Sequence, residues 1–490
     1  RIVAVPLPEA NYSGLASGSA GTLHYLKSDG SQSLFGGSGP AALHRYDLAE
    51  REETELLGGV ENFALSADGT KILATNGAGW FIAEAGAPIE AGAGALDLAS
   101  IRVRIDPRAE WAQIFDEAWR INRDFFYDPG MHGADWPAMR TKYEPFLDDL
   151  AVRSDLNRLI RWMCSELGVG HHRVGGGDFL AEPEEIPGGL LGADFEIAEG
   201  RYRFERVFGG LNWNPELRAP LSEPGVSVKD GEFLLAVDGV DLSADENLFA
   251  RFEHTAGTIV ELTVGPNADD SGSRTVDVVP IASERALRNR AWVEGNLRTV
   301  TEATDGRVAY DYVPNTTTLG HTYFKRYFFP QTDRDAIIID ERYNGGGQVA
   351  DYYIDLLRRP ELSHWAMRYG ADIKTPLSSI QGPKVMIIDE QAGSGGDLLP
   401  WMFRQLELGP LIGRPTWGGL VGTLGFPVLM DGGRVTAPNL GIWTEDGFIV
   451  ENVGVPPDIE VEQWPAETMA GRDPQLEKAI EVVLEMLDMN

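Results

Sequence analysis

Residues 384–397 read KVMIIDEQAGSGGD, an apolar run followed by a glycine-rich turn. The run Lys384–Asp389 has the unbroken hydrophobicity of a strand that is buried on both faces of a parallel sheet. A helical pattern follows at 396–406, and the same order of strand and helix occurs earlier at 336–340 and 349–357. Strands that alternate with helices indicate an α/β fold. We therefore predict an α/β domain with a mostly parallel sheet over residues 286–490.

Ser394 lies between glycines at the predicted strand-to-helix turn. Such a turn can expose a hydroxyl at the carboxyl edge of the sheet. The start of the helix then offers unpaired N–H groups to a developing oxyanion. A nucleophilic serine is one interpretation, and an ordinary glycine-rich turn with Ser394 as the helix cap is the other.

A second glycine-rich turn follows the strand at 336–340 and reads DERYNGGG over 340–347. Three successive glycines allow the backbone to approach a ligand closely and to direct N–H groups at it. Because parallel strands end at the same edge of a sheet, we expect this loop and the Ser394 loop to share one site. A plain β–α connection is the alternative.

A nucleophilic serine needs a base, and the chain offers eight histidines. No lysine occurs between Ser394 and Lys478. His171 and His172 stand out, because they follow a predicted helix and precede three glycines in the segment GVGHHRVGGG, residues 168–177. Either ring could serve as the base, and a surface pair favoured by the helix dipole is the other interpretation.

Two further residues are candidates for this site. Glu451 could orient or polarise part of a hydrolytic site, and it could equally be a solvated turn residue. Trp417, which precedes two glycines, could line a pocket or pack at the end of a strand.

The rest of the chain divides by its hydrophobic periodicity. Helical patterns at 110–127, 136–146 and 155–167 predict a small helical domain over 106–180. Strand patterns over 181–285, with one short helix at 244–252, predict a β module. Residues 1–105 show short strands about ten residues apart and a hairpin at Asp68-Gly69, which is typical of propeller blades or a small sandwich.

Composition excludes several classes of protein. The 490 residues include 42 basic and 75 acidic ones, a formal net charge of −33, which argues against nucleic acid or an anionic membrane as a partner. No apolar run reaches the roughly 18 residues of a membrane span. The lone Cys164 excludes an internal disulfide, and no metal or cofactor motif is present.

The chain begins at Arg1 without a methionine or a signal-like segment, so we expect it to be the C-terminal part of a longer protein. The single cysteine fits a reducing compartment, and we expect a cytoplasmic location. A periplasmic location stays open.

Taken in order, these motifs resemble the tricorn protease family and, more loosely, the carboxy-terminal processing proteases. The resemblance rests on five segments: GVGH at 168–171, DERYNGGG at 340–347, AGSGGD at 392–397, LIGRPTWGG at 411–419 and ENVGVPPDI at 451–459. It implies four domains, which are the C-terminal part of a β-propeller at 1–105, a helical domain at 106–180, a PDZ-like domain at 181–285 and an α/β serine peptidase domain at 286–490.

The resemblance also implies roles for residues. Ser394 would be the nucleophile, His171 the general base, and Glu451 would assist the base. The oxyanion would bind N–H groups of Gly395 and of Gly345, Gly346 and Gly347. Possible substrate contacts are Asp372, His172 and Trp417. The family usually has a serine before the base and an aspartate after the nucleophile, and this chain has Gly170 and Gly395 at those positions.

The activity implied is hydrolysis of short peptides, released by larger proteases, by a homo-oligomer that is possibly a hexamer and needs no cofactor. The alternative is a peptide-binding scaffold of the same family whose altered site is weak or idle.

Overall fold

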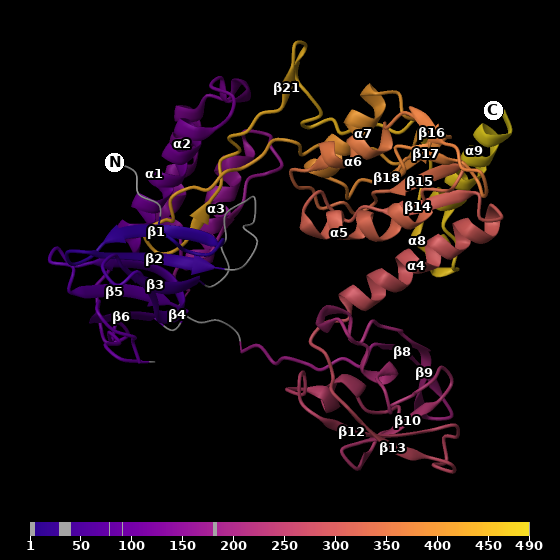
Figure 1. Ribbon diagram of the computed structural model, residues 1–490, viewed down its shortest axis with the longest axis horizontal. Coiled ribbons are helices and arrows are strands. Elements are labelled where there is room, and N and C mark those ends of the chain that lie inside the picture. Colours follow the sequence, from indigo (N-terminus) through magenta and orange to yellow (C-terminus); the bar gives the residue numbers. More distant parts are fainter. Residues whose placement is uncertain (1–4, 29–40, 78, 91, 180–183, 490) are drawn as a thin grey trace. The chain divides into compact units, whose positions relative to one another are not determined.

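The computed structural model describes residues 5–28, 41–77, 79–90, 92–179 and 184–489 (Figure 1). These residues form two compact units, Arg1–Asp106 and Pro107–Asn490. Across the described ranges, no helix has both the length and the apolar character that a membrane crossing requires.

The first unit contains an antiparallel sheet whose six strands are neighbours in sequence order. The strands are β1 (Asn11–Ser17), β2 (Thr22–Ser28), β3 (Ala41–Asp47), β4 (Glu52–Leu65), β5 (Lys71–Asn76) and β6 (Gly79–Glu84). The predicted hairpin is confirmed, because Asp68 accepts hydrogen bonds from the N–H of Thr70 at 3.1 Å and the hydroxyl of Ser66 at 2.6 Å, between β4 and β5. The assignment of this sheet to a propeller stays a prediction.

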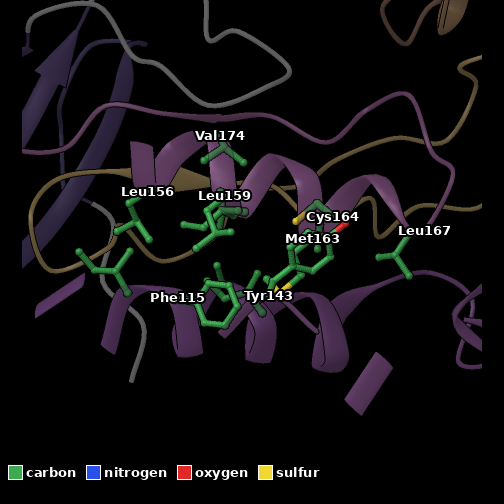
Figure 2. Close-up of a cluster of buried hydrophobic side chains, with 14 of the residues drawn as sticks. Phe115, Tyr143, Leu156, Leu159, Met163, Cys164, Leu167 and Val174 are labelled. Atoms are coloured by element: carbon green, nitrogen blue, oxygen red, sulfur yellow. The ribbon is translucent and has the colours of Figure 1, made fainter. Parts of the chain in front are cut away.

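Three helices begin the second unit, as the periodicity predicts. They are α1 (Pro107–Phe125), α2 (Trp136–Tyr143) and α3 (Arg153–Ser165). Each contributes its apolar face to one core, in which Phe115, Leu156 and Met163 are almost fully buried (Figure 2). Burial of such side chains stabilises a fold by about 1.5–3 kcal/mol each.

A distant part of the chain completes this helical core. Strand β20 (Arg434–Val435) pairs antiparallel with β7 (Val174–Gly175), and Leu429, Val435 and Ala437 are buried with the helices. The buried guanidinium of Arg153 on α3 forms an ion pair with Asp431 and donates to Asn157 Oδ1 at 2.6 Å. The helical domain predicted over 106–180 therefore also contains core residues from 429–437, which the helical periodicity does not predict.

The next module is a β-sheet with the order β13-β12-β10-β9-β8, in which β11 pairs with β10. Its strands are β8 (Ala193–Ala198), β9 (Arg201–Val207), β10 (Phe233–Val237), β11 (Val240–Asp241), β12 (Val260–Gly265) and β13 (Arg274–Val278). The helix predicted at 244–252 is wrong, because only a short 3-10 helix, Leu248–Phe252, forms there. The side chain of Asn247 accepts the N–H of Phe249 at 3.0 Å, so the helix begins later and stays short.

The last module has a five-stranded sheet in which every pair of neighbours is parallel. In spatial order the strands are β14 (Val308–Tyr312), β15 (Ala336–Asp340), β18 (Lys384–Ile388), β19 (Leu411–Gly413) and β23 (Ile459–Glu460). Successive residues of β15 point into different cores, with Ile337 and Ile339 in one and Ala336 and Ile338 in the other. This sheet therefore has a hydrophobic layer on each face, which confirms the predicted α/β fold.

Helices cover both faces of the sheet (Figure 1). The core on one face includes α5 (Thr318–Tyr327), α6 (Ala350–Leu357) and α7 (Gly395–Gln405). The core on the other includes α4 (Arg285–Ala303) and α9 (Pro474–Met489). Smaller elements are the hairpin of β16 (Ser363–Trp365) and β17 (Ile373–Thr375), the hairpin of β21 (Trp443–Thr444) and β22 (Gly447–Phe448), and α8 (Pro465–Met469).

The buried Arg153–Asp431 pair gives the first testable prediction. Asp431→Asn leaves a buried guanidinium without its counter-charge, so we expect the free energy of unfolding of the helical domain to fall by about 3 kcal/mol. Amide hydrogen exchange of α3 and β7 measures this loss. Glu144→Gln, which removes an exposed partner of Arg140, is the control and should cost less than about 1 kcal/mol. Equal losses in the two variants would contradict the prediction.

Candidate active site

Ser394 has a strained backbone at the turn between β18 and α7. Its φ of 59° and ψ of −115° lie in a region that residues other than glycine rarely adopt, at a cost of roughly 1–3 kcal/mol. Two hydrogen bonds hold this turn: Gly393 N–H donates to the Asn344 carbonyl oxygen at 3.0 Å, and Ser394 N–H donates to Asp397 Oδ2 at 2.8 Å. The half-buried serine is therefore fixed at the carboxyl edge of the sheet.

The buried carboxylate of Asp397 connects this turn to the neighbouring loop. Besides Ser394 N–H, it accepts the hydroxyl of Thr416 at 2.5 Å and the N–H groups of Gly418 at 2.8 Å and Gly419 at 3.0 Å. Burial raises the pKa of Asp397, and these hydrogen bonds oppose that rise. Thr416 Oγ1 also accepts the N–H of Val455 at 2.8 Å, so the connection extends to the segment that contains Glu451.

The glycine-rich loop after β15 lies against the serine turn, as the shared sheet edge predicts. A Cβ on Gly346 would come within 2.6 Å of Ser394 Cβ, so any side chain there would collide with the serine. Gly345 N–H already donates to the Pro314 carbonyl oxygen at 3.0 Å, and Gly346 N–H to Asn344 Oδ1 at 2.9 Å. Both of these predicted oxyanion donors thus have acceptors within the protein.

The N–H groups of Gly347 and Gly395 have no acceptor among the residues that the structure describes. They lie close together, because a Cβ on Gly395 would come within 2.8 Å of Gly347 N. The same Cβ would lie 2.0 Å from Thr316 Oγ1. The lack of space explains why this chain has glycine directly after Ser394.

Asn344 holds the glycine-rich loop in place through a buried acid. Its amide nitrogen donates to Glu341 Oε2 at 3.3 Å, while its amide oxygen accepts the N–H of Gly346. Burial, together with the charges of Asp389 and Asp397, raises the pKa of Glu341 well above its usual range. Glu341 Oε2 therefore fixes the orientation of the Asn344 amide.

The two adjacent histidines have different environments. His172 Nε2 lies 2.6 Å from Asn122 Oδ1, its ring stacks on Phe126 at 6.1 Å, and burial lowers its pKa to about 4. His171 instead lies with its ring 5.3 Å from the ring of Trp417. Burial lowers the pKa of His171, and the charge of Arg173 lowers it further. Of the two rings, His171 is therefore the one beside the loops at the sheet edge.

Glu451 contacts the residue that precedes His171. Its Oε1 lies 3.4 Å from Gly170 N, and its Oε2 accepts the N–H of Val421 at 2.9 Å. The residues on either side of it, Val450 and Asn452, both have positive φ. In the described part of the chain, the buried Nδ1 of His171 has no hydrogen-bond partner.

Trp417 lies between the two halves of the site. The backbone N–H of Trp417 donates to the Ala392 carbonyl oxygen at 2.8 Å, and its ring contacts the ring of His171. Asp372 is different, since it lies in the exposed turn between β16 and β17. Within the described ranges no hydrogen bond or ion pair joins Asp372 to the other site residues, and no group of three potential metal ligands occurs.

Comparison with known proteins identifies the three later modules. Family models match the Tricorn protease C1 domain over residues 107–165, the Tricorn protease PDZ domain over 189–283, and Peptidase family S41 over 324–461. Tricorn protease homolog 1 of Streptomyces coelicolor is 34% identical over 505 residues, which cover 100% of this chain and 47% of that protein. The chain belongs to the tricorn protease family.

Two further relatives agree. The tricorn protease of Thermoplasma acidophilum is 30% identical over 451 residues, 91% of this chain and 41% of that protein. A crystal structure of the tricorn protease matches 98% of this chain and 47% of its own, with a TM-score of 0.88 and 27% identity. These matches confirm the predicted resemblance and the PDZ module, and they place residues 324–461 in Peptidase family S41. This tricorn family chain spans less than half the length of each of these relatives.

Asp397 was not among the predicted site residues, although it ends the quoted motif AGSGGD. Its position three residues after Ser394 is the spacing of a capping box, in which the acid accepts the N–H of the first residue. That spacing is the sequence signal from which the contact between Asp397 and Ser394 could have been predicted. The contacts with Thr416, Gly418 and Gly419 depend on the tertiary fold and had no local signature.

This geometry predicts the effect of Asp397→Asn. An amide turns one acceptor atom into a donor, so hydrogen bonds to Ser394, Gly418 or Gly419 are lost at about 1–3 kcal/mol each. We expect amide exchange to become roughly 10- to 100-fold faster at these positions, measured by mass spectrometry of the two loops. Asp458→Asn, which weakens the hydrogen bond from the Leu411 N–H to Asp458 instead, is the control. Unchanged exchange in the serine turn of Asp397→Asn would contradict the prediction.

Proposed function

We propose that this chain hydrolyses peptide bonds with Ser394 as nucleophile and His171 as general base. The observation that supports this most is the convergence at one sheet edge of a strained serine, a half-buried histidine, and two neighbouring N–H groups that have no acceptor among the described residues. Acyl transfer needs a nucleophile, a base and donors for the oxyanion, and strained backbone is found preferentially at active sites.

The proposed reaction begins when Ser394 Oγ attacks the carbonyl carbon of the scissile bond and its proton passes to His171 Nε2. The N–H groups of Gly395 and Gly347 stabilise the oxyanion. His171 then protonates the leaving amine, and the C–N bond breaks to give an acyl-enzyme. A water, deprotonated by the same histidine, releases the acid and restores the serine.

Glu451 has a supporting role in this proposal. Through the Gly170 N–H it holds the loop that presents the base, and its negative charge favours the imidazolium that forms during the reaction. His172 is assigned to packing within the helical domain, because Asn122 and Phe126 engage its ring. Gly345 and Gly346 shape the loop, while their N–H groups stay bound within it.

Short peptides are the proposed substrates, and products of larger proteases are the proposed source. A homo-oligomer, with a hexamer as the suggested form, and a cytoplasmic location stay predictions. Asp372 stays a candidate for selecting a basic residue at the cleavage site, since its exposed turn leaves it free to act in a neighbouring subunit.

The direct test is hydrolysis of fluorogenic peptides with basic, aromatic and small residues before the scissile bond. We expect Ser394→Ala and His171→Ala each to lower kcat by about 10³-fold or more, because each removes a member of the reacting pair. His172→Gln is the matched control and should retain most of the activity. Hydrolysis that survives Ser394→Ala would exclude the proposed mechanism.

A peptide-binding scaffold is the second candidate, and it is favoured by His171 Nδ1, which has no hydrogen-bond partner among the described residues. The two functions separate with a fluorophosphonate, which labels an activated serine but leaves an idle one unmodified. Peptide binding without hydrolysis and without labelling would establish the scaffold.

The pH profile provides a further prediction. The base must be neutral to accept a proton, and burial and Arg173 lower the pKa of His171 below its usual 6.5. We therefore expect the acid limb of kcat/KM to lie below pH 6.5. Arg173→Gln removes a positive charge and should shift the limb to higher pH, whereas Arg173→Lys should not. Glu451, the nearby carboxylate, acts in the opposite direction and is unchanged in both variants.

If the acid limb of the kcat/KM profile does not move in Arg173→Gln, a group other than His171 controls the rate.

A further inference from the structure

Three glycines surround the indole ring of Trp417. A Cβ on Gly170 would lie 2.7 Å from Cζ2 and 2.9 Å from Cη2 of the ring. On the opposite edge, a Cβ on Gly393 would lie 2.5 Å from Cε3, and one on Gly419 would lie 2.3 Å from Cζ3. The ring therefore fills the space that side chains at all three positions would need.

The position of these glycines in the chain is informative. Gly170 directly precedes His171, and Gly393 directly precedes Ser394. One edge of the indole thus touches the backbone of the base loop, and the other edge touches the backbone of the serine turn. Gly419 belongs to the loop held by Asp397, so the same carboxylate fixes both Ser394 and the residue beside the ring.

The ring has little room along the line between Gly170 and the other two glycines. A shift away from Gly170 would drive the opposite edge into the backbone of Gly393 and Gly419. The backbone N–H of Trp417 also donates to the Ala392 carbonyl oxygen at 2.8 Å, which anchors the backbone of Trp417 to the serine turn.

We propose that Trp417 is a positioning residue whose indole acts as a spacer and sets the separation between Ser394 and His171. The proposal rests on the proposed function, because a spacer between these residues matters only if they react together. It also explains Gly170 in this chain: a side chain there would displace the indole or push the base loop away from the serine.

A substrate-contact role for Trp417 makes a different prediction. The ring is partly exposed and lies 5.9 Å from the guanidinium of Arg173, so it could contact a peptide. Loss of such a contact would raise KM for peptides and leave the reaction of Ser394 with a small fluorophosphonate unchanged. Loss of a spacer would lower kcat and the labelling rate together, with little change in KM.

The test is a double-mutant cycle in the full chain. Gly170→Ala adds one methyl group against the ring, at a backbone position without positive φ, and a displacement of about 1 Å costs roughly 100-fold in rate. Trp417→Phe removes the Cζ2 and Cη2 atoms that the methyl group would meet. We expect Gly170→Ala to lower kcat and labelling about 100-fold, and the double variant to recover at least tenfold.

Controls separate this effect from general damage. Gly295→Ala adds a methyl group into open space on α4, and Trp443→Phe alters an exposed indole. Both should keep the wild-type rates. The Tm of each variant is measured as well, since relief of the clash should raise the Tm of the double variant above that of Gly170→Ala whether or not the serine reacts.

The outcomes are distinct. Labelling and hydrolysis that fall in Gly170→Ala and recover in the double variant support the spacer. If the wild type is labelled but the double variant does not recover, the spacer proposal is overturned. Wild-type rates of labelling and hydrolysis in Gly170→Ala would also overturn it. Absence of labelling and of hydrolysis in the wild type would instead overturn the proposed function, with the Tm values still reporting on the packing.

Discussion

The buried carboxylate of Asp397 is the interaction on which the site depends. It accepts four hydrogen bonds that come from the serine turn and from the loop after β19, and Thr416 relays the connection to the segment of Glu451. A buried carboxylate without its donors would be very costly, so the three segments are stable only together. The strained backbone of Ser394 is maintained by this shared arrangement rather than by its own preference.

The parallel sheet supplies the remaining organisation. β15 and β18 are neighbours, so the loops at their carboxyl ends meet without any long connection. Side chains at Gly346 and Gly395 would prevent this contact, and glycine at both positions permits it. His171, the proposed base, comes from a different module, and Glu451 and Trp417 bridge the two modules through Gly170 and His171. Precise chemistry at this edge therefore rests on a few backbone contacts.

Much of this arrangement was predictable from sequence, because it depends on local patterns. Apolar runs and glycine turns located β15, β18 and the two loops, and the shared edge followed from parallel pairing. The choice between His171 and His172 was not predictable, since adjacent residues have the same local signals and only the tertiary contact with Asn122 separates them. The pairing of β20 with β7 was equally hidden, because two-residue strands leave no periodic pattern.

That pairing has a consequence for biosynthesis. Arg153 and its partner Asp431 are 278 positions apart, and β20 is made long after the helices that it joins. During translation from the N-terminus, α1–α3 leave the ribosome with part of their shared core and the counter-charge of Arg153 missing. The module that carries His171 is completed only after Ser394 has been synthesised. In a nascent chain the core around the helices therefore becomes complete only after Ala437 has been synthesised.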